Sequence, residues 1–385
     1  MAAWIALLAV SMVSAQFRAT PLFQWDSVPF DWLSSSQEQQ YIAQGFYNAT
    51  NCAVAGVKSY KGVVFVTVPR WRSGVPATLL ILDQTRQVLT PWPSWTAQAL
   101  DNPMSLFWNV QSMEIDPIGR LWVLDVGRTN FLDADPTAVV NRAPALLVFN
   151  VANGRLLDQY VFPDAVLPAN ASFANDLVLD WRADIAFISD TWGQGGLVVV
   201  DLQNKLSRRF DHPTLQGASV VMQFPEGPFP AASPSDGIAL TPNGTLFYCT
   251  ISTTQLWKLD STVFADWSRT LADVAATVEL VGDKRAFSDG LAMTNNSDVI
   301  WGDLTGGRIV ATSAFGAFQP HALVSKPLAM EWPDTFAFDE VDGSLLFTSN
   351  RLHLFLNNTM TQDSTTVNFR LFRVSGPGPI FSYMH

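Results

Sequence analysis

Cysteine and charge are both scarce in this chain of 385 residues. Two cysteines, Cys52 and Cys249, are too few for a disulfide-framework protein, so the alternatives are one bridge between them or two unpaired buried thiols. Charged residues make up 15% of the sequence, against about a quarter in an average protein, and the net charge is −11. This acidic balance argues against binding to nucleic acid, and it makes a cationic ligand easier to attract than an anionic one.

Long hydrophobic runs are also lacking, apart from one at the N-terminus. Residues 1–15 are mostly apolar and end in Val13-Ser14-Ala15, the small-residue pattern that a signal peptidase cuts. The run is shorter than the roughly 20 residues that span a bilayer. We therefore expect a signal peptide over residues 1–15, no membrane span, and a secreted, extracellular protein whose single domain covers residues 16–385.

Five Asn-x-Ser/Thr sequons fit such a secretory route, since they are acceptors for glycosylation only there. They begin at Asn48, Asn170, Asn243, Asn295 and Asn357. We expect a glycoprotein.

Helix-length periodicity is rare, and one β-rich unit repeats along the chain: a polar residue, a short apolar strand, a turn, and a second apolar strand with an aromatic residue. Six copies place that aromatic at Phe65, Trp122, Phe187, Phe247, Trp301 and Phe347. The intervals run from 46 residues (301 to 347) to 65 (122 to 187), and each accommodates one four-stranded blade of roughly 40 or more residues. The sequence predicts an all-β fold, a six-bladed β-propeller. The alternative, a pair of β-sandwiches, is disfavoured because it would have no common repeat.

The polar residue that opens each repeat predicts a site. If the strand that follows it is the innermost of its blade, these residues converge at one mouth of the central channel. They are Gln111, Asn175, Asp236, Asp289 and Asp334, with Val54 in the first blade. The alternative is that they are turn residues bonded to backbone amides of the next blade.

Several stretches resemble the yellow / major royal jelly protein family, and together they run from about Phe23 to about Phe372. They are Phe23-Gln-Trp-Asp-Ser-Val-Pro-Phe-Asp-Trp32, Val66-Thr-Val-Pro-Arg-Trp-Arg-Ser-Gly-Val-Pro-Ala-Thr-Leu79, Met113-Glu-Ile-Asp-Pro-Ile-Gly-Arg-Leu-Trp-Val-Leu-Asp-Val-Gly127, Phe173-Ala-Asn-Asp176 and Thr348-Ser-Asn-Arg351. The resemblance implies a secreted six-bladed propeller. Members of the family differ in role: some convert dopachrome in melanin formation, some bind biogenic amines, and some are nutritional or structural proteins, so the resemblance fixes fold better than activity.

Two chemistries suit a ring of carboxylates and amides. One is capture of a protonated aromatic amine, with cation–π attraction of roughly 0.5–2 kcal/mol from an aromatic wall. In amine-binding relatives the contacts include a Thr and an Asn, which match Thr335 and Asn350 here, whereas an aromatic contact is replaced by Leu352 or displaced to Phe355. The other is a divalent cation held by oxygen ligands. By resemblance to gluconolactonase-like propellers its ligands would be Asn175 and Asp236, with Glu114 a poor substitute for the third.

The sequence offers few other candidates for catalytic or metal-binding residues. The four histidines, His212, His321, His353 and His385, show no metal-ligand spacing, although His353 follows Asn350 closely enough to approach the channel. Arg70 and Arg72 beside Trp71 either orient an acidic group at the mouth or form inter-blade contacts. No nucleophile elbow, phosphate loop or zinc pattern is found in the sequence.

The leading hypothesis is a secreted protein that binds a biogenic amine or related aromatic metabolite through Asp289, Asp334, Thr335 and Asn350, with Asn175 and Asp236 nearby and no cofactor. A rival is a dopachrome-converting isomerase that uses Asp289 or His353 as its base. A metal-dependent lactonase-like hydrolase and a non-catalytic structural or storage protein are the further alternatives.

Overall fold

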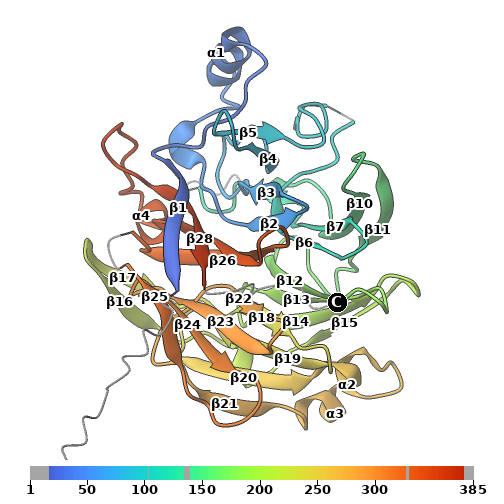
Figure 1. Cartoon of the computed structure of the whole chain (residues 1–385). Coiled ribbons are helices and arrows are strands. Elements are labelled where there is room, and N and C mark those ends of the chain that lie inside the picture. The colour runs from blue at the N-terminus through green and yellow to red at the C-terminus, as the bar shows by residue number, and fades with distance from the viewer. Residues whose placement is uncertain (1–16, 103, 134–138, 327–328, 377–385) are drawn as a thin grey trace, which may run out of the picture.

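Six four-stranded antiparallel sheets surround a central channel in the computed structural model, which describes residues 17–102, 104–133, 139–326 and 329–376. In five of the six sheets the strand that comes first in the chain lies toward the middle of the view in Figure 1, and the strand that comes last lies outermost. The predicted all-β, six-bladed propeller is confirmed, and the paired β-sandwiches are excluded. The expected signal peptide and His385 lie outside the described residues.

The first three blades follow one another along the chain. Blade 1 contains β2 (Val57–Tyr60), β3 (Val63–Thr67), β4 (Leu79–Asp83) and β5 (Val88–Pro91). Blade 2 contains β6 (Val110–Ile115), β7 (Arg120–Asp125), β10 (Ala145–Asn150) and β11 (Leu156–Val161). Blade 3 contains β12 (Ala174–Asp180), β13 (Ile185–Asp190), β14 (Gly196–Asp201) and β15 (Leu206–Phe210).

The last three blades continue the series, and the sixth takes its outer strand from the N-terminal end of the chain. Blade 4 contains β18 (Ser235–Leu240), β19 (Thr245–Thr250), β20 (Gln255–Asp260) and β21 (Glu279–Asp283). Blade 5 contains β22 (Leu291–Met293), β23 (Asp298–Asp303), β24 (Arg308–Ser313) and β25 (His321–Ser325). Blade 6 contains β26 (Trp332–Asp339), β27 (Ser344–Asn350), β28 (Phe369–Ser375) and β1 (Arg18–Trp25).

Two features close the ring. The N-terminal strand β1 pairs antiparallel with β28, from Arg18 opposite Ser375 to Trp25 opposite Phe369, so both ends of the described chain share one sheet. The innermost strands β2, β6, β12, β18, β22 and β26 also contact one another in order, and β26 contacts β2. The ring therefore leaves no gap between the first and the last blade.

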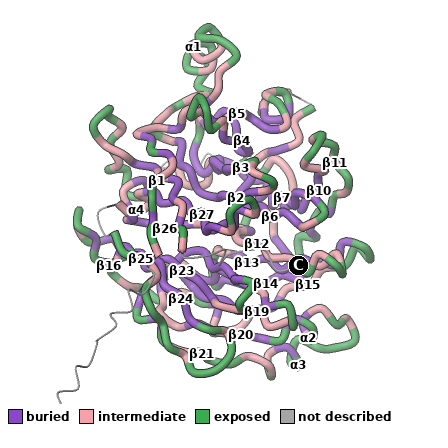
Figure 2. The backbone as a smooth tube through the Cα atoms, viewed as in Figure 1, coloured by how far each residue is buried: buried purple, intermediate pink, exposed green. Residues whose placement is uncertain are grey.

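A separate hydrophobic cluster fills each interface between neighbouring blades. The six aromatic residues that defined the repeat all lie on second strands, and none is more than 1% exposed. Figure 2 shows the same division, with buried inner strands and exposed outer elements such as β21 and α1. Phe247 and Trp301 share the interface between blades 4 and 5, and none of the six lies between blades 6 and 1. The aromatic periodicity thus reflects one buried aromatic residue on the second strand of each blade.

Glycine follows the ring aspartates of blades 4 and 5 because the inner strands approach closely there. A Cβ atom on Gly237 would lie 2.3 Å from the carbonyl oxygen of Asp289, and one on Gly290 would lie 2.6 Å from that of Asp334. Any larger residue would push neighbouring blades apart. This close approach explains the glycine in the repeated Ser-Asp-Gly sequence.

Short elements lie between the blade strands. They are α1 (Ser35–Ala43), η1 (Ala49–Asn51), β8 (Arg128–Thr129), β9 (Val139–Val140), η2 (Pro213–Leu215), β16 (Val220–Phe224), β17 (Gly227–Ala231), α2 (Ser261–Ala265), α3 (Leu271–Ala275) and α4 (Leu352–Leu356). Helix α1 projects from the edge at the top of Figure 1 and buries none of its residues. In the described part of the chain, no helix combines the length and apolarity needed to cross a membrane.

The two cysteines are both buried and free, so the structure contradicts the suggested Cys52–Cys249 bridge in favour of its alternative. Cys52 belongs to the cluster around blade 1, whereas Cys249 lies on β19 in the cluster between blades 4 and 5. Different interfaces hold the two thiols, and burial raises the pKa of Cys52 above its usual range.

Candidate ligand site at the channel mouth

A cavity of about 210 Å³ lies at the end of the channel where the inner strands begin. All five polar residues that the repeat singled out line it: Gln111, Asn175, Asp236, Asp289 and Asp334. Four of the five lie in inner strands whose pairing is irregular at this point, between Val110 and Ser112 in β6, for example, and Asp289 lies two residues before β22. The irregularity releases the polar residue from the regular ladder, which allows its side chain to face the channel.

The first blade contributes Ala55 to this ring, not Val54. The amide of Gly56 bonds to Thr67 Oγ1 just as the amide of Thr335 bonds to Thr348 Oγ1, which makes Gly56 equivalent to Thr335 and Ala55 equivalent to Asp334. Ala55 also lines the cavity. The repeat alignment, which gave Val54, was therefore wrong by one residue. In the first blade the ring position carries no polar side chain.

The polar ring side chains are bonded to one another and not mainly to backbone amides. Trp71 Nε1 donates to Gln111 Oε1 (2.8 Å), Gln111 Nε2 donates to Asn175 Oδ1 (2.7 Å), and Asn175 Nδ2 donates to Asp236 Oδ2 (2.5 Å). Asp236 in turn hydrogen-bonds to Asp289, which accepts from Trp332 Nε1 at 2.6 Å. The chain of bonds fixes the orientation of each group before any ligand arrives.

The three aspartates of the ring hold protons more tightly than ordinary carboxyl groups. None is more than 7% exposed, and this burial, together with their mutual repulsion, raises the pKa of Asp236 and Asp289 well above the usual value. A hydrogen bond between two carboxyl groups requires a proton, so the contact between Asp236 and Asp289 favours protonation of one of them. Burial also raises the pKa of Asp334 to about 6, although donors on Thr335 and Asn350 oppose the change.

Aromatic side chains form the rest of the cavity wall: Trp71, Phe131, Phe173, Trp192, Phe229 and Trp332. Phe131 packs against Phe173 and edge-on against Trp192, with ring centroids 5.1 and 6.1 Å apart. The guanidinium of Arg128 lies 4.4 Å from the Trp192 ring centre. The cavity therefore combines buried carboxyl groups with π-faces.

The sequence predicted an aromatic wall and pointed to Trp71, but it did not identify the other residues, although a signal for part of them exists. Phe173 and Trp332 each stand two residues before a ring residue, Asn175 and Asp334. An aromatic residue at that offset lies beside the channel mouth. Phe131 and Trp192 come from loops for which the repeat gives no rule.

Thr335 and Asn350, the residues suggested by the family resemblance, occupy different positions relative to the cavity. Thr335 lines the cavity and donates from Oγ1 to Asp334 Oδ1 (2.8 Å). Asn350 is buried behind it: its Nδ2 donates to the carbonyl oxygen of Val54 and to Asp334 Oδ2. Asn350 does not line the cavity, so the structure assigns it to positioning Asp334.

The missing aromatic contact is replaced by aliphatic side chains. Leu352 and Leu356 line the cavity, whereas Phe355 lies against Trp71 and beneath the guanidinium of Arg72, 4.2 Å from its ring centre. Of the two suggested substitutes, Leu352 is the one at the site.

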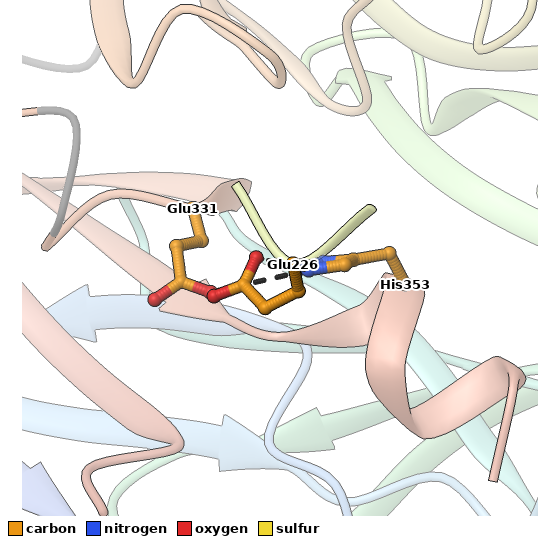
Figure 3. Close-up of side chains that lie close together, drawn as sticks. All are labelled: Glu226, Glu331 and His353. Carbon is orange, nitrogen blue, oxygen red and sulfur yellow. Dashed lines mark hydrogen bonds and ion pairs between the residues drawn. The ribbon is translucent and has the colours of Figure 1, made fainter. Parts of the chain in front are cut away.

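His353 does not reach the cavity. Its ring stacks on Phe224 with centroids 4.0 Å apart, and Nε2 lies 3.3 Å from Glu226 Oε2, in the turn between β16 and β17 (Figure 3). Burial lowers the pKa of His353, and Nδ1 has no partner among the described residues. A neutral, stacked imidazole outside the cavity is not placed to act as the base.

Glu226, Glu331 and His353 form a group whose ligand atoms lie within 4.8 Å of one another, as Figure 3 shows. Arg351 already supplies the positive charge in this group, since it donates to Glu331 Oε2 (2.7 Å) and Glu226 Oε1 (2.6 Å). The arrangement ties the β16–β17 hairpin to the start of α4. We call these four residues the hairpin latch.

The metal set inferred from lactonase-like propellers does not assemble. Glu114 faces the opposite end of the channel and pairs with Lys58 at 2.8 Å. Asn175 presents its amide NH₂ group to Asp236, whereas a metal ligand would present an oxygen. The residues present therefore do not fit that catalytic metal.

The remaining candidates lie away from the cavity. Arg70 is 1% exposed and donates to backbone carbonyls of residues such as Val75 and Gln98, and Arg72 donates to that of Phe355, so both hold the fold together. His212 caps η2. The five sequon asparagines are all exposed: Asn48, Asn170, Asn243, Asn295 and Asn357.

Fold and site together define a six-bladed propeller with an acidic, aromatic-walled cavity at one channel mouth. The sequence profile of the major royal jelly protein family matches residues 109–376, and the chain belongs to this family. It is 26% identical to "Protein yellow" of Drosophila subobscura over 95% of this chain and 67% of that protein, and 25% identical to "Protein yellow" of Drosophila madeirensis over the same shares.

Solved structures support the fold alone. A luciferin-regenerating enzyme superposes with a TM-score of 0.53 at 12% identity, covering 86% of this chain and 93% of that one. A putative gluconolactonase superposes with a TM-score of 0.52 at 10% identity, covering 96% and 95%. At such identities the shared architecture does not transfer an activity.

Proposed function

We propose that the channel-mouth cavity binds a small protonated aromatic amine. The observation that carries this proposal is the enclosure of three buried carboxyl groups by six aromatic side chains within about 210 Å³. The ammonium group would lie beside Asp289 and Asp334, and the aromatic ring would pack against Phe131, Phe173 and Trp192. Cation–π contact adds roughly 0.5–2 kcal/mol to the charge attraction.

Titration calorimetry with serotonin, dopamine and octopamine tests the proposal. At least one of them should bind the wild type, and Asp334→Asn should weaken binding at least about tenfold, because it removes the charge next to the ammonium. N-acetylserotonin, whose amide nitrogen carries no charge, should bind weakly. Asp211→Asn is the matched control, since that carboxylate is exposed and does not line the cavity. Absence of heat with all three amines would remove the proposal.

A second candidate is a dopachrome-converting isomerase, favoured by the adjacent carboxyl groups of Asp236 and Asp289, whose pKa values are both raised by burial. A carboxyl pair that holds one proton can accept a proton from one ring position and return it to another. The coloured dopachrome band should then decay faster with the protein present, and Asp289→Asn should slow the decay at least about tenfold. A rate equal to that in buffer would exclude this activity.

We also propose that the chain is secreted and glycosylated. The support is the N-terminal sequence pattern together with exposure of all five sequon asparagines. Expression in insect cells should deliver the protein to the medium, beginning at Gln16, and treatment with a glycosidase should lower its apparent mass. Retention of the protein inside the cells would contradict the proposal.

A further inference from the structure

A second cavity, of about 500 Å³, opens at the other end of the channel. It is lined by the later residues of the inner strands and by the turns that follow them, whereas the channel-mouth cavity is lined by the strand beginnings. Asp176 borders both spaces. The channel therefore has two chambers that meet at one carboxylate.

Apolar side chains from four inner strands make up most of the wall of this second cavity. They include Leu177, Ile238, Leu291, Met293, Phe336 and Phe338. A cavity of this size lined by aliphatic and aromatic groups is typical of ligand sites, which commonly measure about 300–1,000 Å³. The wall favours an apolar body in the ligand.

A small polar group lies where the second cavity meets the first. Lys58 Nζ pairs with Glu114 Oε2 at 2.8 Å, and Glu114 Oε1 accepts from the amide of Ile115. Asp176 accepts from the amides of Leu177 and Ile238, at 2.9 and 3.1 Å. One ammonium thus faces two carboxylates, which leaves a negative charge unbalanced.

The lining of the second cavity as a whole carries the same excess of negative charge. Five acidic residues line the cavity, namely Glu114, Asp116, Asp176, Asp180 and Asp266, against the basic residues Lys58 and Arg182. Asp116 is paired with Arg120, but the balance at the inner end remains one cation to two anions. A carboxylate in the ligand would be repelled here, and a cation attracted.

We propose that this second cavity binds an elongated apolar molecule ending in a protonated amine, with the ammonium beside Asp176 and the hydrocarbon along Leu291, Met293 and Phe336. This site is separate from the aromatic-amine site, because its walls are aliphatic for most of their length and because it opens at the opposite mouth. Two ligands of different shape can therefore occupy one channel.

Calorimetry with octylamine, octanol and octanoate, three molecules with the same chain length, tests the ligand class. Octylamine should bind at least about tenfold more tightly than octanol, and octanoate most weakly, because only the head-group charge differs. Comparable binding of octanoate, or no binding of octylamine, would overturn the proposal.

Three variants locate the octylamine site. Lys58→Gln removes the cation that competes for the carboxylates, so it should tighten octylamine binding several-fold, and Asp176→Asn should weaken it. Asp334→Asn, in the other cavity, should leave it unchanged even if no aromatic amine binds there. Loss of octylamine binding in Asp334→Asn, with no effect of Lys58→Gln, would contradict the second site. Glu279→Gln, an exposed carboxylate on β21, is the control.

Discussion

At the scale of single residues, Asp334 controls the charge of the channel-mouth cavity. Its neighbours Thr335 and Asn350 both donate to it, which favours the ionised carboxylate, but burial outweighs them and raises its pKa to about 6. Small pH changes near neutrality therefore switch the group that is proposed to receive the ammonium.

The affinity for an aromatic amine should accordingly fall on acidification. An ammonium binds the ionised form of Asp334, and a proton competes with it below pH 6, so affinity should drop about tenfold between pH 7.5 and pH 5. Calorimetry at several pH values measures the slope. Asp334→Asn should bind weakly with little pH dependence, and an unchanged slope in that variant would assign the effect to another group.

The ring itself could be predicted from sequence, because its residues open a repeat whose spacing is local. The positions of Asn350 and His353 could not. Asn350 is the last residue of β27 and His353 follows three residues later, yet Asn350 turns inward to Asp334 while His353 stacks on Phe224 of a hairpin contributed by residues 220–231. Such a hairpin lies outside the repeat, so the pattern gives no information on what it covers.

At the scale of elements, the β16–β17 hairpin lies outside the six blades and yet contributes to the channel mouth. It forms a two-stranded sheet of its own, and its Phe229 lines the cavity and packs edge-on against Trp332. The hairpin latch fixes its turn through Glu226, which Arg351 holds at 2.6 Å. The position of a residue of the cavity wall therefore depends on one ion-pair network.

Breaking the latch should loosen the hairpin without unfolding the propeller. A charge-assisted hydrogen bond contributes about 1.5–3 kcal/mol, so in Arg351→Met the amides of residues 220–231 should exchange with solvent at least about tenfold faster. Hydrogen–deuterium exchange measures this, with the inner strands as internal reference.

Glu226→Gln is the matched variant, because it removes the charge on the hairpin but keeps the pair between Arg351 and Glu331 at 2.7 Å. It should show a smaller effect at the same residues. Equal acceleration in the inner strands would mean that Arg351 supports the whole blade instead of the hairpin.

At the scale of the whole molecule, the repeat explains architecture and not chemistry. The six buried aromatics on second strands fix the blade number, and any six-bladed propeller brings its inner strands to one channel. The repeat placed the first-blade position at Val54 instead of Ala55, because no polar side chain marks it and because irregular pairing at the starts of β6, β12, β18 and β26 blurs the common spacing. Loop aromatics such as Trp192 depend on contacts between blades, which no single repeat encodes.

The concentration of buried carboxyl groups in the channel should also shape stability. Burial raises the pKa of Asp176 to about 6, raises that of Asp334 to about 6, and raises those of Asp236 and Asp289 well above 3.8. The folded chain then holds protons that the unfolded chain has released above about pH 4, so these groups stabilise the fold at acidic pH and lose that contribution as pH rises through 6.

Two histidines act in the opposite direction, since burial lowers the pKa of His212 and His353 and the folded state resists their protonation below about pH 6.5. With four carboxyl groups against two imidazoles, thermal unfolding should occur at a higher temperature at pH 5.5 than at pH 7.5. Asp236→Asn should reduce the difference in unfolding temperature between pH 5.5 and pH 7.5. It should also raise the unfolding temperature at pH 7.5, because the neutral amide retains the bond from Asn175 without a buried charge.

Asp211→Asn should leave the difference in unfolding temperature unchanged. Scanning calorimetry at both pH values measures it, and an equal difference in Asp236→Asn and wild type would show that the channel carboxyl groups are not its source.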